Sequence, residues 1–155
     1  MEALQVVLYK RDLRVRDHGP LREAASVGPV LPLAVVEPAL WAQPDASARQ
    51  WAFFAESLLE LRQELSRLGA SLVVRVGEMV PVLSALQDQV AIGCLWSHEE
   101  TGNGWTYARD RALATWCRER GIPWRQLPQN GVVRRLASRE GWARRWEEQI
   151  GRAHV

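Results

Sequence analysis

The sequence predicts an α/β fold: a five-stranded, parallel, doubly wound sheet of the Rossmann or flavodoxin-like type, in three α/β/α layers. Two observations predict it. Five short apolar runs with β-forming composition alternate along the chain with segments of helical periodicity. The runs are almost continuously apolar, which is typical of parallel strands covered by helices on both faces. We expect the strand order 3-2-1-4-5, with the topological switch point between the first and fourth strands.

Each element follows from a local pattern. The first strand is Leu4–Tyr9, and a short helix begins near Pro20. The second strand, Val30–Val36, precedes a long helix from Ser47 to Leu68, which Gly69 stops. The apolar face of this helix repeats at steps of four and three residues: Phe54, Leu58, Leu61, Leu65 and Leu68. The remaining elements are the strands Leu72–Val76, Ala91–Ser97 and Trp124–Leu127 and the helices Pro81–Gln87 and Trp105–Arg120.

Size and composition limit the function classes. With 155 residues, 47% of them hydrophobic, the chain is long enough for one domain with a full core. A net charge of +2 does not by itself indicate nucleic-acid binding. No apolar stretch reaches membrane-spanning length and the first strand leaves no room for a signal peptide, so we expect a cytoplasmic protein with no membrane partner. Cys94 and Cys117 are expected to be reduced and buried, and no ligand spacing indicates a metal.

Charged residues follow the first and fourth strands. Lys10, Arg11 and Asp12 come after the first, and His98, Glu99 and Glu100 begin the loop that leads into the turn Thr101-Gly102-Asn103-Gly104. Parallel strands present their carboxyl ends at one edge, where open α/β sheets bind ligands. The sequence therefore predicts a crevice between these strands, basic on one side and acidic on the other. Alternatively, these charges pair with one another and hold the loops in place.

The pattern changes after Leu127. Gln129-Asn130-Gly131 is typical of a turn, so we place the end of the α/β domain at residue 129. In the segment that follows, residues 130–155, arginines are interleaved with Trp142 and Trp146. The two indoles are four residues apart and would share one helical face, which predicts a partner surface for them.

The segment Tyr9-Lys10-Arg11-Asp12-Leu13-Arg14-Val15-Arg16-Asp17-His18-Gly19-Pro20-Leu21 closely resembles the Arg-Arg-Asp-Leu-Arg-x-x-Asp-Asn-x-x-Leu opening of the DNA photolyase and cryptochrome family. Lys10 stands where the family usually has its first Arg, and His18 where it usually has Asn. Similar pieces follow in the family's order at residues 28–33, 36–40, 47–58, 72–78 and 107–110. The resemblance covers nearly the whole chain.

The resemblance implies that residues 1–129 are an antenna domain, which covers a light-harvesting folate, deazaflavin or FMN. A larger helical domain downstream would bind FAD and, in photolyases, damaged DNA. Light would pass to reduced FAD, which splits pyrimidine dimers, and cryptochromes use similar photochemistry for signalling. Residues 130–155 would begin the linker to that helical domain, before which the chain stops. We therefore expect no catalytic residue in this chain and no repair by the chain alone.

The resemblance also suggests contacts. The candidates for the antenna chromophore are Lys10, Arg11, Asp12, Glu37, His98, Glu99, Glu100, Trp105 and Arg109. The candidates for contact with the helical domain are Arg14, Asp17, Trp142 and Trp146. Folate-using members often carry Asn-Glu where this chain has Trp105 and Thr106. Trp105 either stacks on a planar chromophore or packs on the sheet, and Glu37 either bonds a ring or is an exposed loop acid.

Other functions compete with this one. A free-standing nucleotide binder of the universal stress protein type would need a glycine-rich phosphate cradle. Gly102-Asn103-Gly104 is the only candidate for such a cradle, and it is a weak one. An interaction module would dock a partner through the Trp-rich tail. For hydrolysis, no serine lies in a nucleophile-elbow pattern, and His98 beside two glutamates is either an acid–base group or a hydrogen-bonded loop residue.

Overall fold

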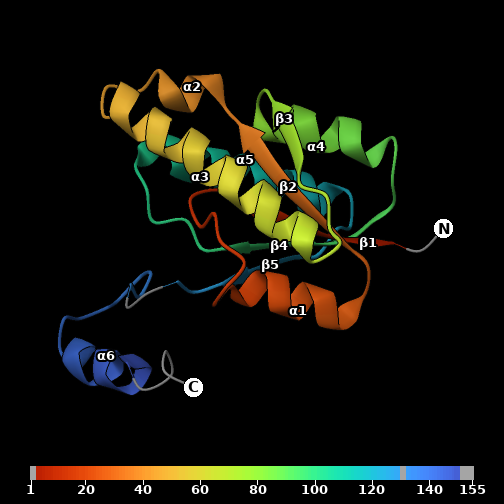
Figure 1. Ribbon diagram of the computed structural model, residues 1–155. Coiled ribbons are helices and arrows are strands. Elements are labelled where there is room, and N and C mark those ends of the chain that lie inside the picture. Colours follow the sequence, from red (N-terminus) through yellow and green to blue (C-terminus); the bar gives the residue numbers. More distant parts are fainter. Residues whose placement is uncertain (1–2, 130–131, 151–155) are drawn as a thin grey trace.

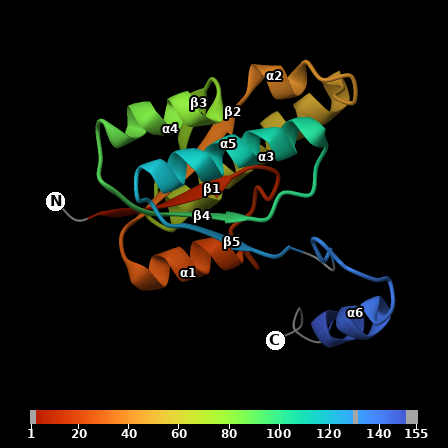
Figure 2. The same ribbon diagram turned by 180° about the vertical axis from the view of Figure 1, so that it is seen from behind.

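The structure, a computed structural model, describes residues 3–129 and 132–150. These residues form a parallel sheet of order β3-β2-β1-β4-β5 between two layers of helices (Figures 1 and 2). The strands are β1 (Leu4–Tyr9), β2 (Val30–Val36), β3 (Val73–Val76), β4 (Ile92–His98) and β5 (Trp124–Leu127). The fold class and the strand order predicted from the sequence are confirmed.

Four helices cover the two faces of the sheet. Ala24, Leu61 and Leu65 place α1 and α3 against one face, and Leu83 and Leu113 place α4 and α5 against the other. The helices are α1 (Gly19–Val27), α2 (Pro38–Trp41), α3 (Ala48–Arg67), α4 (Met79–Gln87), α5 (Gly104–Glu119) and α6 (Trp142–Ile150). The sequence does not predict α2, because a single turn is too short to show a helical period.

Local side-chain chemistry fixes where the long helices begin and end. Ser47 accepts a hydrogen bond from the backbone N–H of Gln50 and so caps α3. Gly69 follows this helix at φ +82°, the left-handed conformation in which glycine is least strained. The prediction that Leu68 belongs to the buried face is wrong: it is 67% exposed, because it is the C-cap residue and the chain leaves the helix there.

The core lies on both sides of β1, the central strand. Val6 and Leu8 pack against the face that carries α4 and α5, and Val7 packs against the face that carries α1 and α3. All three are fully buried, and burial of each stabilises the fold by about 1.5–3 kcal/mol. Cys94 and Cys117 are buried and unbridged, as predicted, and they belong to core clusters on opposite faces of the sheet.

The indoles of Trp142 and Trp146 stack on one face of α6, as predicted, with ring centroids 5.8 Å apart and planes at 10°. Both side chains are exposed. The predicted turn residues Asn130 and Gly131, and residues 151–155, lie outside the described residues. Among the described helices, none is both long enough and apolar enough to cross a membrane.

Candidate functional site

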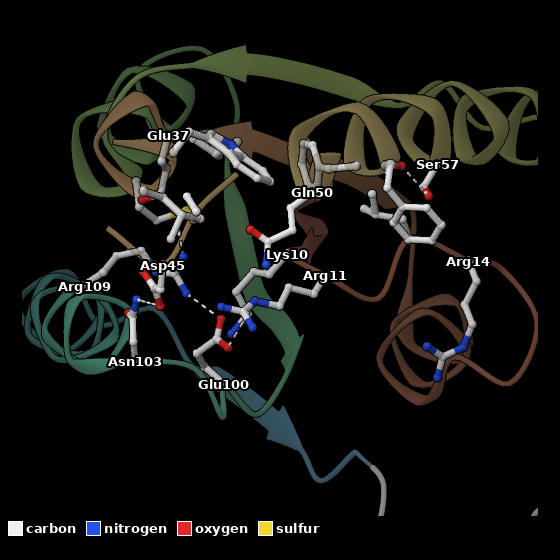
Figure 3. Close-up of a pocket in the computed structure, with 18 residues that line it drawn as sticks. Lys10, Arg11, Arg14, Glu37, Asp45, Gln50, Ser57, Glu100, Asn103 and Arg109 are labelled. Carbon is white, nitrogen blue, oxygen red and sulfur yellow. Dashed lines mark hydrogen bonds and ion pairs between the residues drawn. The ribbon is translucent and has the colours of Figure 1, made fainter. Parts of the chain in front are cut away.

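A cavity of about 480 Å³ opens at the carboxyl edge of the sheet (Figure 3). Its polar side chains come mainly from the loops after β1, β2 and β4: Lys10, Arg11, Arg14, Glu37, Asp45, Gln50, Ser57, Glu100, Asn103 and Arg109. Its apolar side chains are Leu40 and Trp41 of α2, Phe53 and Phe54 of α3, and, from other elements, Leu13, Val35, Ala46 and Met79. The cavity therefore reaches beyond the predicted crevice between β1 and β4, because α2 and the start of α3 form its further wall.

Aromatic rings form much of that further wall. Trp41 meets Phe54 with ring centroids 5.2 Å apart, and both line the cavity. Behind them, the ring of Trp51 lies 5.1 Å from that of Trp41, edge to face. We call Trp41, Phe53 and Phe54 the aromatic wall. The aromatic wall was not predicted from the sequence as a binding feature, although Phe54 belongs to the predicted apolar face of α3.

Arg109 organises the acidic side chains beneath the cavity. Its Nη1 donates to Glu37 Oε2 at 2.8 Å, and its Nη2 donates to Glu100 Oε2 at 3.0 Å. Its Nε and Nη2 also bond Asp110 Oδ1, at 3.1 and 3.0 Å. All four side chains are more than nine-tenths buried. One guanidinium thus holds three carboxylates, which come from the residue after β2, the β4–α5 loop and α5. This excludes the alternative of an exposed Glu37.

Burial shifts the pKa of the groups around this cluster in opposite directions. It raises the pKa of Glu37, although the Arg109 guanidinium acts to lower it. Burial lowers the pKa of Lys10, against the attraction of Asp110, whose Oδ2 lies 3.5 Å from Lys10 Nζ. In Arg109 the carboxylate of Glu37, followed by that of Asp110, outweighs burial and raises the pKa of the guanidinium. Desolvated charges that are held in pairs are common at binding sites.

The loops after β1 and β4 are joined by charge, as the second of the two sequence-based alternatives predicted. Arg11 Nε lies 3.8 Å from Glu100 Oε1. Deeper in the sheet edge, His98 Nδ1 donates to Asp12 Oδ2 at 2.6 Å. Both pairs connect neighbouring strands at the switch point.

Asp12 also bonds a second histidine. His18 Nε2 donates to the same oxygen, Asp12 Oδ2, at 2.5 Å, and His18 Nδ1 accepts the N–H of Leu21 at the start of α1. Burial alone would raise the pKa of Asp12, but the hydrogen bonds from His18 and His98 hold that pKa well below its usual range. All three side chains are buried.

This group has the composition of a metal site, which the sequence spacing did not indicate. The ligand atoms of Asp12, His18 and His98 lie within 4.8 Å of one another. However, His18 Nδ1 accepts a backbone hydrogen bond, so the proton of the neutral ring is on Nε2 and occupies the lone pair that a metal would need. The arrangement acts as a hydrogen-bonded support that ties the start of α1 to the end of β4.

Most of the other sequence-predicted residues do not line the cavity, and Arg14 is the exception. Half-buried Trp105 has the guanidinium carbon of Arg109 5.8 Å from its ring centroid. The backbone N–H of Glu99 donates to Leu127 O at 2.8 Å and so ties the β4–α5 loop to β5. Arg14, which lines the cavity, also donates to the carbonyl oxygens of Arg16 and Asp17. Asp17 is exposed and has φ +49°.

Gly102 leaves the space that the loop needs, and this gives a testable expectation. A Cβ there would lie 2.4 Å from Thr106 Oγ1 and 2.9 Å from Arg11 Nη2. Thr106 is buried and its hydroxyl donates to Asn103 O, so it has little freedom to move. We expect Gly102→Ala to lower the free energy of unfolding by about 1–3 kcal/mol, measured by urea titration. The control is Gly104→Ala, where no heavy atom lies within 4 Å; equal effects of the two changes would contradict the expectation.

Comparisons with known proteins agree with this architecture. A sequence model described as DNA photolyase matches residues 5–150. Cryptochrome DASH of Gloeobacter violaceus is 32% identical over 101 residues, which are 61% of this chain and 20% of that protein. The chloroplastic/mitochondrial cryptochrome DASH of Arabidopsis thaliana is 27% identical over 107 residues, or 64% of this chain and 19% of that protein. The chain thus spans about a fifth of the length of these relatives.

Two solved structures share the fold. An archaeal photolyase from Sulfolobus tokodaii superposes with a TM-score of 0.72 at 27% sequence identity, over 84% of this chain and 30% of that one. A Synechocystis cryptochrome superposes with a TM-score of 0.77 at 21% identity, over 85% of this chain and 28% of that one. The second similarity shows the fold alone.

Proposed function

The chain belongs to the DNA photolyase family, as its N-terminal α/β domain, and we propose that its cavity holds the antenna chromophore of a longer light-dependent protein. The observation that carries the proposal is the cavity itself, with an aromatic wall on one side and charged groups on the other. None of the similarities described above points to universal stress proteins, the alternative from the sequence.

The residues present fit a planar, polar-edged chromophore. A volume of about 480 Å³ is within the range of small-molecule pockets, about 300–1,000 Å³. The face of a flavin, deazaflavin or pterin ring would pack on Trp41 and Phe54, as planar aromatic systems do. Such a chromophore absorbs blue or near-ultraviolet light and passes the excitation energy on. The description of the archaeal photolyase names two FAD molecules and a novel light-harvesting cofactor, which makes a flavin the first ligand to test.

The sequence-predicted residues divide into two groups in this proposal. Lys10, Arg11, Glu37, Glu100 and Arg109 line the cavity and would orient the polar edge of the chromophore. A second group, Asp12, His98, Glu99 and Trp105, lies outside the lining, and its members would act by positioning the loops.

The activity of the whole protein follows as a proposal from the family. A helical domain of the same protein would bind FAD and damaged DNA, and the antenna would feed it with energy. Trp142 and Trp146 on α6, with Arg14 and Asp17, are the proposed contacts with that domain, and α6 lies within the family match. A cytoplasmic location stays a prediction.

Ligand titration tests the antenna proposal. FMN, FAD, a deazaflavin and methenyl-folate are each titrated into the chain, and binding is followed by absorption and by protection against thermal unfolding. We expect at least one to bind, and Trp41→Leu to weaken it about tenfold or more, since ring stacking contributes about 1–3 kcal/mol.

The matched control is Tyr107→Leu, which removes an exposed aromatic ring of α5 that does not line the cavity. It should leave the affinity unchanged. The proposal fails if none of the four compounds binds, or if both substitutions weaken binding equally.

A further inference from the structure

We propose that Arg11 makes the cavity selective for chromophores with a phosphate or similar anionic tail, with the ring against the aromatic wall and the tail at Arg11. This inference rests on the proposed function, because it concerns the same cavity. It goes further in naming the chemical class of the ligand and the residue that selects it.

Arg11 is only weakly paired with a carboxylate. Its side chain is 60% exposed, and its nearest carboxylate, Glu100, lies 3.8 Å away. Glu100 is already engaged: Oε2 accepts from Arg109 at 3.0 Å and Oε1 accepts the N–H of Thr101 at 3.1 Å. An exposed pair with this geometry contributes little, so the guanidinium can turn toward a ligand without loss of an important contact.

The other cations that line the cavity already bond carboxylates or backbone carbonyl oxygens. Arg109 is buried and bonded to three carboxylates, and buried Lys10 lies against Asp110. Arg14 uses Nε and Nη2 for the carbonyl oxygens of Arg16 and Asp17. Arg11 is thus the lining cation with the least committed donors, and Figure 3 shows it reaching into the cavity toward Glu100.

The neighbouring β4–α5 loop leaves room for the guanidinium of Arg11. A Cβ on Gly102 would come within 2.9 Å of Arg11 Nη2, so the absence of a side chain at this position leaves the space that the guanidinium occupies. A guanidinium offers paired N–H donors that match two oxygens of a phosphate at once. Asp45, an acid that also lines the cavity, is held by a hydrogen bond of 2.8 Å that its carboxylate accepts from Asn103.

Riboflavin and FMN test the inference, because they share one ring and differ by a phosphate. Dissociation constants for both are measured by fluorescence titration at about 0.05 M salt, where charge interactions are screened least. We expect the chain to bind FMN about tenfold more tightly than riboflavin. Arg11→Gln should bring the ratio to about one by weakening FMN binding more than riboflavin binding, and salt at about 0.5 M should reduce the ratio in the unsubstituted chain.

The control is Arg22→Gln, an exposed arginine of α1 that pairs with its neighbour Glu23 and does not line the cavity. It should keep the preference for FMN. Equal affinity for the two flavins in the unsubstituted chain, or a preference that survives Arg11→Gln, overturns the inference alone. Failure of riboflavin, FMN, FAD, deazaflavin and folate to bind overturns the proposed function with it.

Discussion

Replacing Arg109 by leucine is expected to lower the free energy of unfolding by about 3–5 kcal/mol, the range for breaking a buried ion pair from one side. The change would leave three buried carboxylates, those of Glu37, Glu100 and Asp110, without the guanidinium that bonds them all. Urea titration at neutral pH measures the loss. Because protonation removes uncompensated charge, the deficit should shrink as the pH falls through the pKa of Glu37, which burial raises.

Arg111→Leu is the matched control, since Arg111 is an exposed residue of the same helix. It should change stability by no more than about 0.5 kcal/mol. Adding Glu37→Gln to the Arg109 variant removes one of the unpaired charges and should restore part of the stability. A loss below about 1 kcal/mol for Arg109→Leu would show that the cluster does not depend on its guanidinium.

Asp12→Ala is expected to lower the free energy of unfolding by a comparable amount, about 3–5 kcal/mol, since it removes two buried hydrogen bonds of about 1.5–3 kcal/mol each to a charged group. His18 and His98 would keep N–H donors in a buried place without their acceptor. The loop after β1 and the end of β4 would lose the more buried of the two contacts that join them. Thermal and urea unfolding measure the effect, with the exposed acid Asp88→Ala as control.

The pH dependence of this effect has a definite sign. In the folded state the pKa of Asp12 is held well below its usual range, whereas in the unfolded chain it is about 3.9. The folded state therefore gains stability from this carboxylate above about pH 4, and loses it as the pH falls below that value. The difference between the unsubstituted chain and Asp12→Ala should narrow between about pH 5 and pH 2. A difference that stays constant over that range would contradict the assigned role of the Asp12 carboxylate.

The sequence predicted the architecture well because each strand carries its own signal. A run such as Val30–Val36 is apolar on both faces. This pattern is typical of a parallel strand that helices cover on both sides of the sheet. The helix stop at Gly69 was equally local, and this glycine has a positive φ. Leu68 was misplaced because its helical spacing continues one residue beyond the helix itself.

The site was predictable only in part, because its contacts join residues distant in the chain. Topology alone placed Arg11 and Glu100 at the same sheet edge, so their proximity followed from the strand order. The burial of Glu37 under Arg109 could not be predicted from the strand order, since it depends on how α5 packs at the end of β2. Nor did the pairing of His18 with His98, whose rings are brought together by the fold with centroids 4.6 Å apart.

The central place of β1 has a consequence for how the chain acquires its structure. β1 is synthesised before its partner strands and can pair with β2 early, but its other edge is completed only by β4, where Gln5 pairs with Cys94. Until then an apolar strand has an open hydrogen-bonding edge, and non-local parallel pairing is slow to close. The most buried strand of the fold is therefore the one whose edge stays open longest during synthesis, and unpaired strand edges are prone to aggregate.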